Sequence, residues 1–401
     1  MLAYCTERPS QEKTEQRSAI KERYMESTLF VNRYIEKTKG ETNMTQHNRR
    51  TFLHQLGLGT LGLLAADQVS AALAQAPKIK AGQIGTRHAH ASGKVGTMRK
   101  FTDLYDVVGV VEPDLDRRKE LENTSAYKGV KWMTEEELLN TSGLQLVCVE
   151  TAVKDLLDAA ERCIDAGLHI HLDKPAGEDF KQFTRIVNKA KKQELIIQMG
   201  YMFRYNPGFR VLFKAASEGW LGNIHEAHGV ISKTVGQSTR NTLAEYKGGT
   251  MFELGCHLID SLTVFMGAPD KVTPYVRHTY PDRDNLADNI IGMFEYPRAT
   301  ATIRSSLMEV EGFRRRQMVA VGENGTITIR PLEAPIVEVT MAKDTGDFKK
   351  GSHLIEVPKL GGRYDGDFLE LAEVLHGKRE FPFSYQHDLT VQKAILDASG
   401  Y

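Results

Sequence analysis

A lysine, a histidine and a glutamate are the side chains of this sequence best suited to proton and hydride chemistry on an alcohol. Lys174 follows one short apolar run, and Glu253 and His257 stand four residues apart in another. Oxidising a secondary alcohol needs a base for the hydroxyl proton, a donor for the developing carbonyl oxygen and a hydride acceptor. An imidazole titrates near neutrality, so His257 can be the base, and the ammonium of Lys174 can hold the oxygen. Glu253, on the same helix face as His257, can orient the imidazole or bind another hydroxyl.

Two of these residues also have a structural interpretation. Thr250-x-x-Glu253 is a capping box, which would make Glu253 a helix-start residue, and the two roles can coexist. A single histidine on an apolar helix is usually a satisfied core side chain. The partner Glu253 and the preceding Gly248-Gly249 favour the functional role for His257.

Four further polar residues are candidates for contact with a substrate. Tyr201, Arg204 and Asn206 follow a predicted strand at a change of pattern, where they could line the site or form a hydrogen-bonded crossover. Asp260, three residues after His257, could bind substrate or only form a salt bridge or a cap.

A polar loop after the first predicted strand is the candidate dinucleotide site. The loop reads Gly85-Thr86-Arg87-His88-Ala89-His90, so Gly85 alone keeps the glycine pattern of a dinucleotide fingerprint. Backbone N–H groups can still face a pyrophosphate, and Arg87 or His88 could contact phosphate. The alternative is a surface loop on a sheet that has lost its nucleotide.

Glu112 ends the second predicted strand, where a carboxylate can accept hydrogen bonds from the adenine ribose. The same charge repels a 2′-phosphate, so NAD is predicted over NADP. The nearby Arg117 and Arg118 could offset this preference or lie on a solvated helix surface.

These side chains need parallel strands to bring them together. Apolar runs that alternate with helical patterns predict a doubly wound parallel sheet in the first part of the chain. The predicted strands are 79–84, 106–111, 145–149, 169–172 and 195–199, and Gly167 ends a predicted helix over 154–166.

After residue 206 the pattern changes to an α+β arrangement with a large, open, mostly antiparallel sheet. Polar turns such as Glu323-Asn324-Gly325 separate some of its strands. One helix is predicted before this sheet and two after it, over 208–217, 365–376 and 388–399. The predicted strands are 224–231, 272–276, 290–296, 300–305, 317–321, 326–330, 337–341 and 353–357.

Three motifs in order resemble the Gfo/Idh/MocA family of glucose–fructose oxidoreductase, inositol dehydrogenase and relatives. Asp173-Lys174-Pro175 resembles its glutamate-lysine-proline motif, 200–207 its crossover into the second domain, and 248–260 its glycine-rich helix with a histidine. The resemblance implies a Rossmann domain, a sugar or polyol substrate and a homo-oligomer formed through the second sheet. Asp173 would then reach the nicotinamide ribose.

The sequence departs from the family pattern in two places beyond the glycine loop. Glu253 is one methylene longer than the usual aspartate, and Ala152-Val153-Lys154-Asp155-Leu156 replaces a Pro-Asn-x-x-His stretch. Two other functions of this fold therefore stay open: a nicotinamide-dependent glycoside hydrolase with no net redox change, and a non-catalytic sugar-binding relative.

The first 76 residues are predicted to lie outside the folded enzyme. Arg49-Arg50, an apolar stretch interrupted by glycines and the small residues before Pro77 resemble a twin-arginine export signal, and no stable membrane span is expected. The predicted organisation is 1–43 as an extension or a mis-assigned start, 44–76 as the signal, 77–199 as the Rossmann domain and 200–401 as the substrate and oligomerisation domain. A periplasmic enzyme of this kind should hold its cofactor tightly, because no soluble nicotinamide pool is expected there.

Composition excludes several other classes of partner. Lys plus Arg equals Asp plus Glu at 52 each, which gives no support for nucleic acid as a partner. The four cysteines form no CxxC pair, so neither zinc nor a disulfide framework is predicted. No metal is predicted at the pairs His88/His90 and His169/His171, because neither shows a third ligand.

Overall fold

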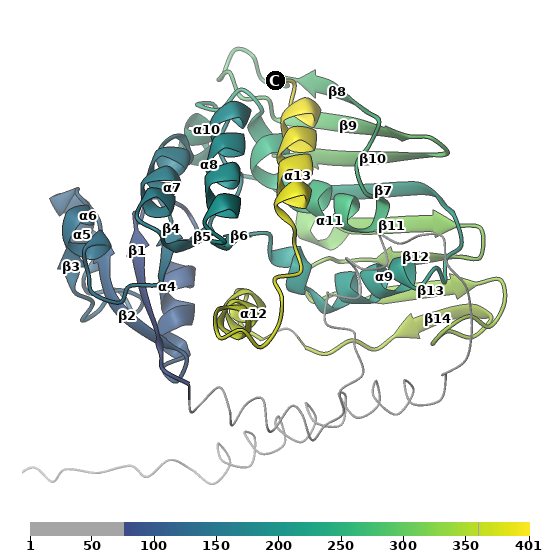
Figure 1. Cartoon of the computed structure of the whole chain (residues 1–401). Coiled ribbons are helices and arrows are strands. Elements are labelled where there is room, and N and C mark those ends of the chain that lie inside the picture. Colours follow the sequence, from purple (N-terminus) through teal and green to yellow (C-terminus); the bar gives the residue numbers. More distant parts are fainter. Residues whose placement is uncertain (1–75, 360) are drawn as a thin grey trace, which may run out of the picture.

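The computed structural model describes residues 76–359 and 361–401, which form two sheets with helices packed on them (Figure 1). Residues 1–43 and all but the last residue of the predicted signal lie outside the described part. No helix in that part is long and apolar enough to cross a membrane.

The first sheet is parallel and has the strand order β3-β2-β1-β4-β5-β6, the doubly wound order of dinucleotide-binding domains. This confirms the predicted Rossmann fold. The carboxyl ends of β1, β4 and β5 lie side by side at the switch point of this order. The strands are β1 (Ile79–Ile84), β2 (Tyr105–Val111), β3 (Trp132–Met133), β4 (Leu146–Val149), β5 (His169–Leu172) and β6 (Ile197–Met199).

Side-chain caps begin several of the crossover helices. Asp114 accepts hydrogen bonds from the first backbone N–H groups of α5, Thr134 forms a capping box with Glu137 on α6, and Asp179 caps α8. The amphipathic α8 buries Phe183 and its neighbours against the sheet. The helices are α4 (Ala91–Lys100), α5 (Leu115–Leu121), α6 (Glu135–Leu139), α7 (Leu156–Asp165) and α8 (Phe180–Lys192).

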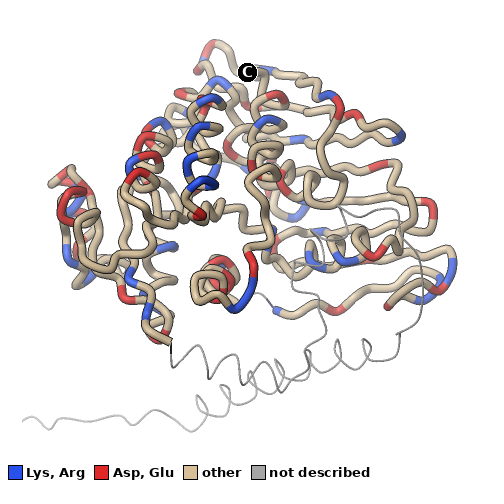
Figure 2. Tube along the Cα trace, viewed as in Figure 1, with Lys and Arg blue, Asp and Glu red and all other residues tan. Residues whose placement is uncertain are grey.

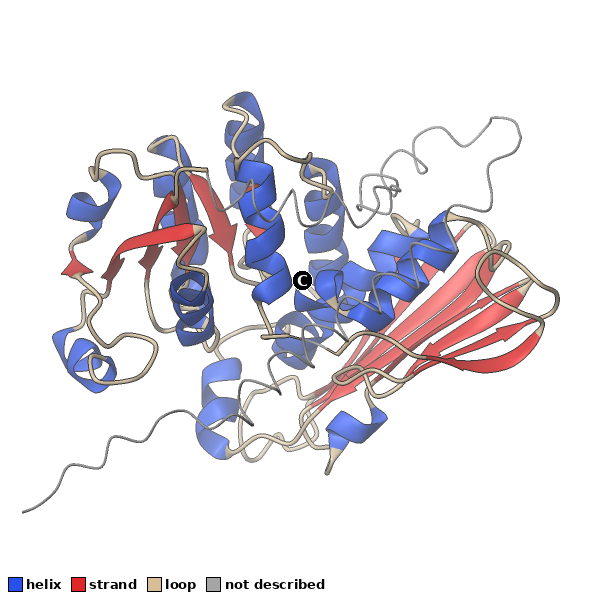
Figure 3. Ribbon diagram, turned by 90° about the horizontal axis from the view of Figure 1, so that it is seen from below, coloured by secondary structure: helices blue, strands red, loops and turns tan. Residues whose placement is uncertain are grey.

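The second sheet is mostly antiparallel and has the order β14-β13-β12-β11-β7-β10-β9-β8, with β7 and β10 parallel. Helices lie against one of its faces (Figure 3). This confirms the predicted α+β part. Its strands are β7 (Ile224–Ser232), β8 (Lys271–Arg277), β9 (Asn289–Tyr296), β10 (Ala299–Ser306), β11 (Gln317–Gly322), β12 (Gly325–Ile329), β13 (Val337–Met341) and β14 (Gly351–Ile355).

The helices of the second part include one π-helical turn, Met251–Gly255, which runs directly into α11 (Cys256–Met266). Every residue of α11 except Met266 is buried, so the helix runs through the core between the sheet and α13. The other helices are α9 (Pro207–Ser217), α10 (Gln237–Leu243), α12 (Asp365–Leu375) and α13 (Tyr385–Ala398).

Helix α12 belongs to the core of the first sheet, although it comes near the end of the chain. Phe368 and Leu371 pack in one cluster with Ile79 of β1 and Cys148 of β4. The hydroxyl of Tyr105 donates to the carbonyl of Phe368 at 2.5 Å. The predicted division of the chain at residue 200 therefore does not describe α12.

Acidic and basic side chains are interspersed over both parts of the molecule (Figure 2). The helix α8 carries a run of basic positions, and acidic positions lie on the neighbouring α7 (Figure 2).

Candidate functional site

Lys174 and Glu253 meet at the junction of the two parts, although 79 residues separate them. Lys174 lies two residues beyond the end of β5 and is 1% exposed. Its Nζ donates to the backbone carbonyl of Glu253 at 2.7 Å and lies 3.2 Å from the carboxylate Oε1. The structure thus joins two of the three residues that the sequence predicts as catalytic.

The π-helical turn determines where Glu253 points. Gly249 precedes it with φ +44°, and a Cβ there would lie 2.1 Å from the carbonyl oxygen of Ala287. The Thr250 hydroxyl pairs with Ser305 at 2.7 Å and caps no helix, so the predicted capping box is wrong. The Glu253 carboxylate contacts Lys174, and no contact with the imidazole of His257 is present. π-helical turns occur frequently at functional sites.

His257 is the second residue of α11 and is 2% exposed. Its ring lies edge-on to Tyr201, with the centroids 6.3 Å apart, and 5.6 Å from the ring of Phe203. No described residue provides a hydrogen-bond partner for Nδ1. Burial holds the pKa of His257 well below its usual value, and the charge of Lys174 lowers it further. The imidazole is therefore neutral at physiological pH.

The Lys174–Glu253 pair stays ionised despite its burial. Burial opposes the charge on Lys174, but the attraction of Glu253, Cys256 and Asp173 together outweighs it and raises the pKa of the lysine. Burial likewise opposes the charge on Glu253, and Lys174 lowers the pKa of this carboxyl. The site therefore presents a charged ammonium beside a neutral imidazole.

Lys233 is a further basic residue of this region that sequence reasoning missed. It follows β7 and is half-buried. Burial lowers its pKa, with Lys174, Arg316 and Arg363 contributing repulsion and Glu253 contributing attraction. No local motif marks Lys233, because its role depends on how the second sheet places it near Glu253.

The loop after β1 has the backbone expected of a dinucleotide site but different side chains. Gly85 has φ +86°, and a Cβ there would lie 2.6 Å from the backbone of Thr151. Thr86 donates to the Glu112 carboxylate at 2.6 Å. Arg87 is half-exposed and forms a 2.5 Å ion pair with Asp114. The Glu112 carboxylate is buried at the end of β2 and also accepts from the Asp114 backbone.

His88 and His90 turn inward from this loop toward Asp173. The Nδ1 atoms of the two histidines lie 2.9 and 3.0 Å from Oδ2 of Asp173. Asp173 follows β5, so the parallel sheet brings it to the same edge as the loop. The three residues form a possible metal-ligand set, and the expectation that the His88/His90 pair lacks a third ligand is wrong. His169 and His171 point elsewhere: Nδ1 of His169 accepts from Ile196, and His171 contacts Lys94 and Gln198.

The residues predicted to contact substrate from the crossover lie in structural contacts. Arg204 is fully buried and pairs with Asp260 and Asp388, each at 2.7 Å. Asn206 caps α9 and donates to the carbonyl of Leu332 at 2.9 Å. These contacts favour the hydrogen-bonded crossover, while Tyr201 lies against His257 and adjoins the site.

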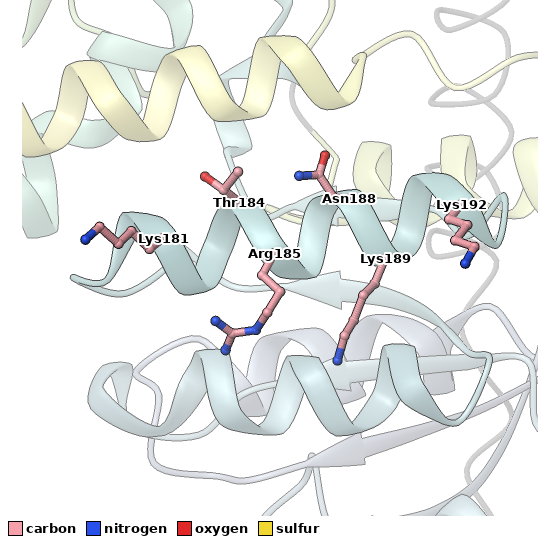
Figure 4. A pocket seen from close by; sticks show the side chains of 6 residues that line it. All are labelled: Lys181, Thr184, Arg185, Asn188, Lys189 and Lys192. Carbon is pink, nitrogen blue, oxygen red and sulfur yellow. The ribbon is translucent and has the colours of Figure 1, made fainter.

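A surface hollow lies away from this junction, on α8 (Figure 4). Its lining includes Arg185 and Lys189, which point toward α7, where both pair with Glu161. Because two of its cations are already paired with acidic residues and it lies away from Lys174 and His257, we assign no function to this hollow. The lining residues are Lys181, Thr184, Arg185, Asn188, Lys189 and Lys192.

The fold is that of a two-domain Rossmann oxidoreductase, and comparison with known families agrees. Residues 79–201 match the oxidoreductase family with an NAD-binding Rossmann fold, and residues 209–328 match the GFO/IDH/MocA C-terminal domain. The chain therefore carries both domains of the Gfo/Idh/MocA oxidoreductase family.

Curated relatives are distant dehydrogenases. The chain is 26% identical over 217 residues to myo-inositol 2-dehydrogenase of Thermotoga maritima, which covers 53% of this chain and 58% of the relative. It is 26% identical over 144 residues to scyllo-inositol 2-dehydrogenase (NADP(+)) of Bacillus subtilis, a match that covers 35% of this chain and 40% of the relative. It is 23% identical over 199 residues to mouse trans-1,2-dihydrobenzene-1,2-diol dehydrogenase, and this match covers 48% of this chain and 57% of the relative. The matches thus span about two fifths to three fifths of each relative's length.

Solved structures share the fold. Aldose-aldose oxidoreductase from Caulobacter crescentus, complexed with glycerol, superposes with a TM-score of 0.68 at 17% identity, covering 80% of this chain and 98% of that one. UDP-N-acetylglucosamine 3-dehydrogenase from Acidithiobacillus ferrooxidans gives 0.66 at 15% identity, covering 80% and 97%.

Proposed function

We propose that this protein transfers a hydride between a secondary alcohol of a sugar or polyol and a tightly held nicotinamide cofactor. The observation that carries the proposal is the contact of Lys174 with Glu253, one turn before a buried His257 with a free Nδ1. The sugar or polyol dehydrogenases among the relatives and structural neighbours support this substrate class.

The residues at the ends of β1 and β2 fit a dinucleotide. Gly85 allows the chain to turn close to β4, and Glu112 offers carboxylate lone pairs to ribose hydroxyls. The charge of Glu112 disfavours a 2′-phosphate, and Arg87 is already paired with Asp114, so we propose NAD rather than NADP. A bound nicotinamide supplies the hydride acceptor.

The chain's own side chains would manage the proton and the oxygen. His257 is neutral, so its imidazole can accept the hydroxyl proton. The ammonium of Lys174 has three N–H donors, two of which are directed at Glu253. The third can hold the substrate oxygen as charge develops, and burial strengthens that interaction by excluding water.

The proposal is tested by identifying the cofactor and then the substrate. Mass spectrometry of nucleotide released from purified protein should find NAD, and a panel of sugars and polyols should reduce it, as followed by nicotinamide absorbance. Hydrolysis of a glycoside without net NADH would assign the chain to the nicotinamide-dependent hydrolases. Absence of any bound nucleotide, with no reduction by the panel, would identify a non-catalytic relative and refute the proposal.

Export is a separate proposal that rests on Arg49-Arg50 and the small residues before Pro77. The twin-arginine route carries folded proteins, which suits an enzyme that retains its cofactor. N-terminal sequencing of periplasmic protein should give a start close to Pro77. Retention of the Arg49→Lys, Arg50→Lys double variant in the cytoplasm would support the route, and normal export of that variant would refute it.

We also propose that copies associate through the second sheet. Tyr275 of β8 and Leu354 of β14, on the two edge strands of the sheet, are 51% and 74% exposed, and a second copy would cover them. Light scattering after size-exclusion chromatography should give a multiple of the chain mass, and a monomer would refute this arrangement.

A further inference from the structure

Two histidines and two carboxylates meet beside the loop that follows β1. His88 Nδ1 lies 2.9 Å from Oδ2 of Asp173 and 4.0 Å from Oε2 of Glu150, and His90 Nδ1 lies 3.0 Å from the same Asp173 oxygen. Asp173 and Glu150 are fully buried, and only His90 retains partial exposure. The four side chains come from the β1–α4 loop and from the ends of β4 and β5, so the sheet order itself brings them together.

The hydrogen bonds of His88 leave its Nδ1 as an acceptor. Its Nε2 lies 3.1 Å from the backbone carbonyl of Lys174, which can only accept, so Nε2 carries the proton. The Nδ1 atom then faces the Asp173 carboxylate, which is an acceptor. Two acceptors at 2.9 Å repel unless a proton or a cation lies with them. Metal-ligating histidines typically show this arrangement, with the second ring nitrogen donating to a carbonyl.

The side chain of Glu150 gives independent support for a ligand at this place. Its side chain is fully buried, and no N–H or O–H group of the described residues donates to either carboxylate oxygen. A buried carboxylate without a partner is destabilising unless a proton or a cation neutralises it. Burial and the neighbouring Asp173 raise its pKa well above the usual value, while the charge of Lys94 lowers it. The nearby Lys94 is directed at His171 and Asp367.

We propose that His88, His90, Asp173 and Glu150 bind one divalent first-row transition ion. Imidazole suits zinc, iron and nickel, and two histidines with a carboxylate form a known facial set for such ions. Ligand atoms at about 2.0–2.2 Å from a tetrahedral ion lie about 3.4 Å from one another. The ligand atoms of His88, His90 and Asp173 all lie within 4.8 Å of one another, so small side-chain rotations produce that geometry.

The ion would balance the charge of the two buried carboxylates and fix the β1–α4 loop to the end of β5. His90 occupies a glycine position of the dinucleotide fingerprint, and binding of the ion would explain a histidine there. The proposal goes beyond hydride transfer and does not depend on it, because the ligands can be tested in nucleotide-free protein.

The experiment uses untagged protein that has been stripped with a chelator and freed of nucleotide. Calorimetric titration with Zn²⁺ and elemental analysis after desalting should give one ion per chain. Co²⁺ should give the visible absorption bands of a low-symmetry, four- or five-coordinate site. No stoichiometric uptake of either ion by the wild-type protein would overturn the proposal.

Substitutions of the proposed ligands test which side chains bind the ion. His90→Gln should lower the affinity for Zn²⁺ by about a hundredfold, and Glu150→Gln, which lies outside the proposed catalytic and nucleotide residues, by about tenfold or more. The matched control His353→Gln alters an exposed histidine on β14 and should bind as the wild type does. Unchanged affinity in both His90→Gln and Glu150→Gln would refute the site. If a variant fails to fold, the melting temperature of wild-type protein decides, since it should rise with Zn²⁺ only if the native state binds the ion.

Discussion

Two buried clusters of charge lie along the same helical stretch and differ in how completely their hydrogen-bonding groups are used. Lys174 and Glu253 meet at the π-helical turn, next to His257. One turn further, Asp260 on α11 pairs with the fully buried Arg204, which also pairs with Asp388 on α13.

In the second cluster, here called the closed cluster, the charges pair with one another, and Nη1 of Arg204 has no partner among the described residues. Nε and Nη2 of Arg204 donate to carboxylates, His387 lies 3.3 Å from Asp260, and the guanidinium stacks 3.8 Å from the ring of Phe383. In the first cluster an ammonium proton and an imidazole nitrogen remain available. Burial of charge with an unfilled hydrogen-bonding group therefore does not by itself mark a catalytic site here, because Nη1 of the buried Arg204 also lacks a partner among the described residues.

Replacing His257 is the strongest test of the open cluster. We expect His257→Ala to reduce turnover about a hundred- to ten-thousandfold, because it removes the proton acceptor. The fold should survive, since no described residue bonds to Nδ1 and none is left unpaired. Steady-state turnover is measured beside thermal unfolding, with His257→Gln as a variant that fills the space. Near-normal turnover in the alanine variant would remove His257 from the mechanism.

Arg204→Met tests the closed cluster. The change leaves Asp260 and Asp388 buried without their cation, so the free energy of unfolding should fall by about 3–5 kcal/mol. Turnover per folded molecule should stay close to wild type. The control Arg314→Met, on an exposed side chain, should change stability by less than about 0.5 kcal/mol. A stable variant with lost turnover would restore the sequence-based interpretation of Arg204 as a substrate ligand.

The substitution Lys174→Ala tests whether the Lys174–Glu253 pair of the open cluster is catalytic or structural. Removal of a donor directed at developing charge should lower turnover by about a hundredfold or more. Glu253 then loses its buried partner, so some stability is lost as well. Lys181→Ala on the exposed side of α8 serves as the control. Unaltered turnover would mean that the Lys174–Glu253 pair is structural, like the Arg204 cluster.

The smallest effect expected is a pH dependence of stability. The pKa of His257 is lower in the folded protein than in the unfolded chain, where it is about 6.5. The unfolded chain therefore binds the proton more readily, and the stability that is fully present above pH 6.5 falls as the pH decreases. Denaturant unfolding should show a loss of up to about 1.4 kcal/mol per pH unit below 6.5 that His257→Gln lacks. Equal slopes in the two proteins would mean that the imidazole is accessible to protons in the folded state.

The local pattern of apolar and polar residues was sufficient to predict most of the strands. The bounds of β1, β5 and β13 agree with those expected from apolar runs, and the other predicted strands agree within two residues. Helix α8 was missed, although its buried side chains, beginning with Phe183 and Ile186, recur at helical spacing. The two-residue β3 is too short to give any pattern.

The candidate site was less accessible to sequence reasoning, because its decisive contacts are distant in the chain. Lys174 and His257 were found through motifs, but the π-helical turn that points Glu253 at Lys174 depends on packing against Ala287 and Ser305. Asp173 joins His88 across more than 80 residues, which only the order of the parallel strands could have indicated.

The late position of α12 affects how the protein is made. Phe368 and Leu371 complete one face of the first sheet, yet they are synthesised after nearly the whole second domain. Until these residues leave the ribosome, a nascent chain therefore leaves part of the surface of β1 and β4 uncovered, although Met98 of α4 packs in the same cluster. Chaperones can bind the uncovered part during that interval. The two domains of the finished protein should unfold in one cooperative step, because α12, which follows the second sheet in the chain, packs on β1 and β4 of the first sheet.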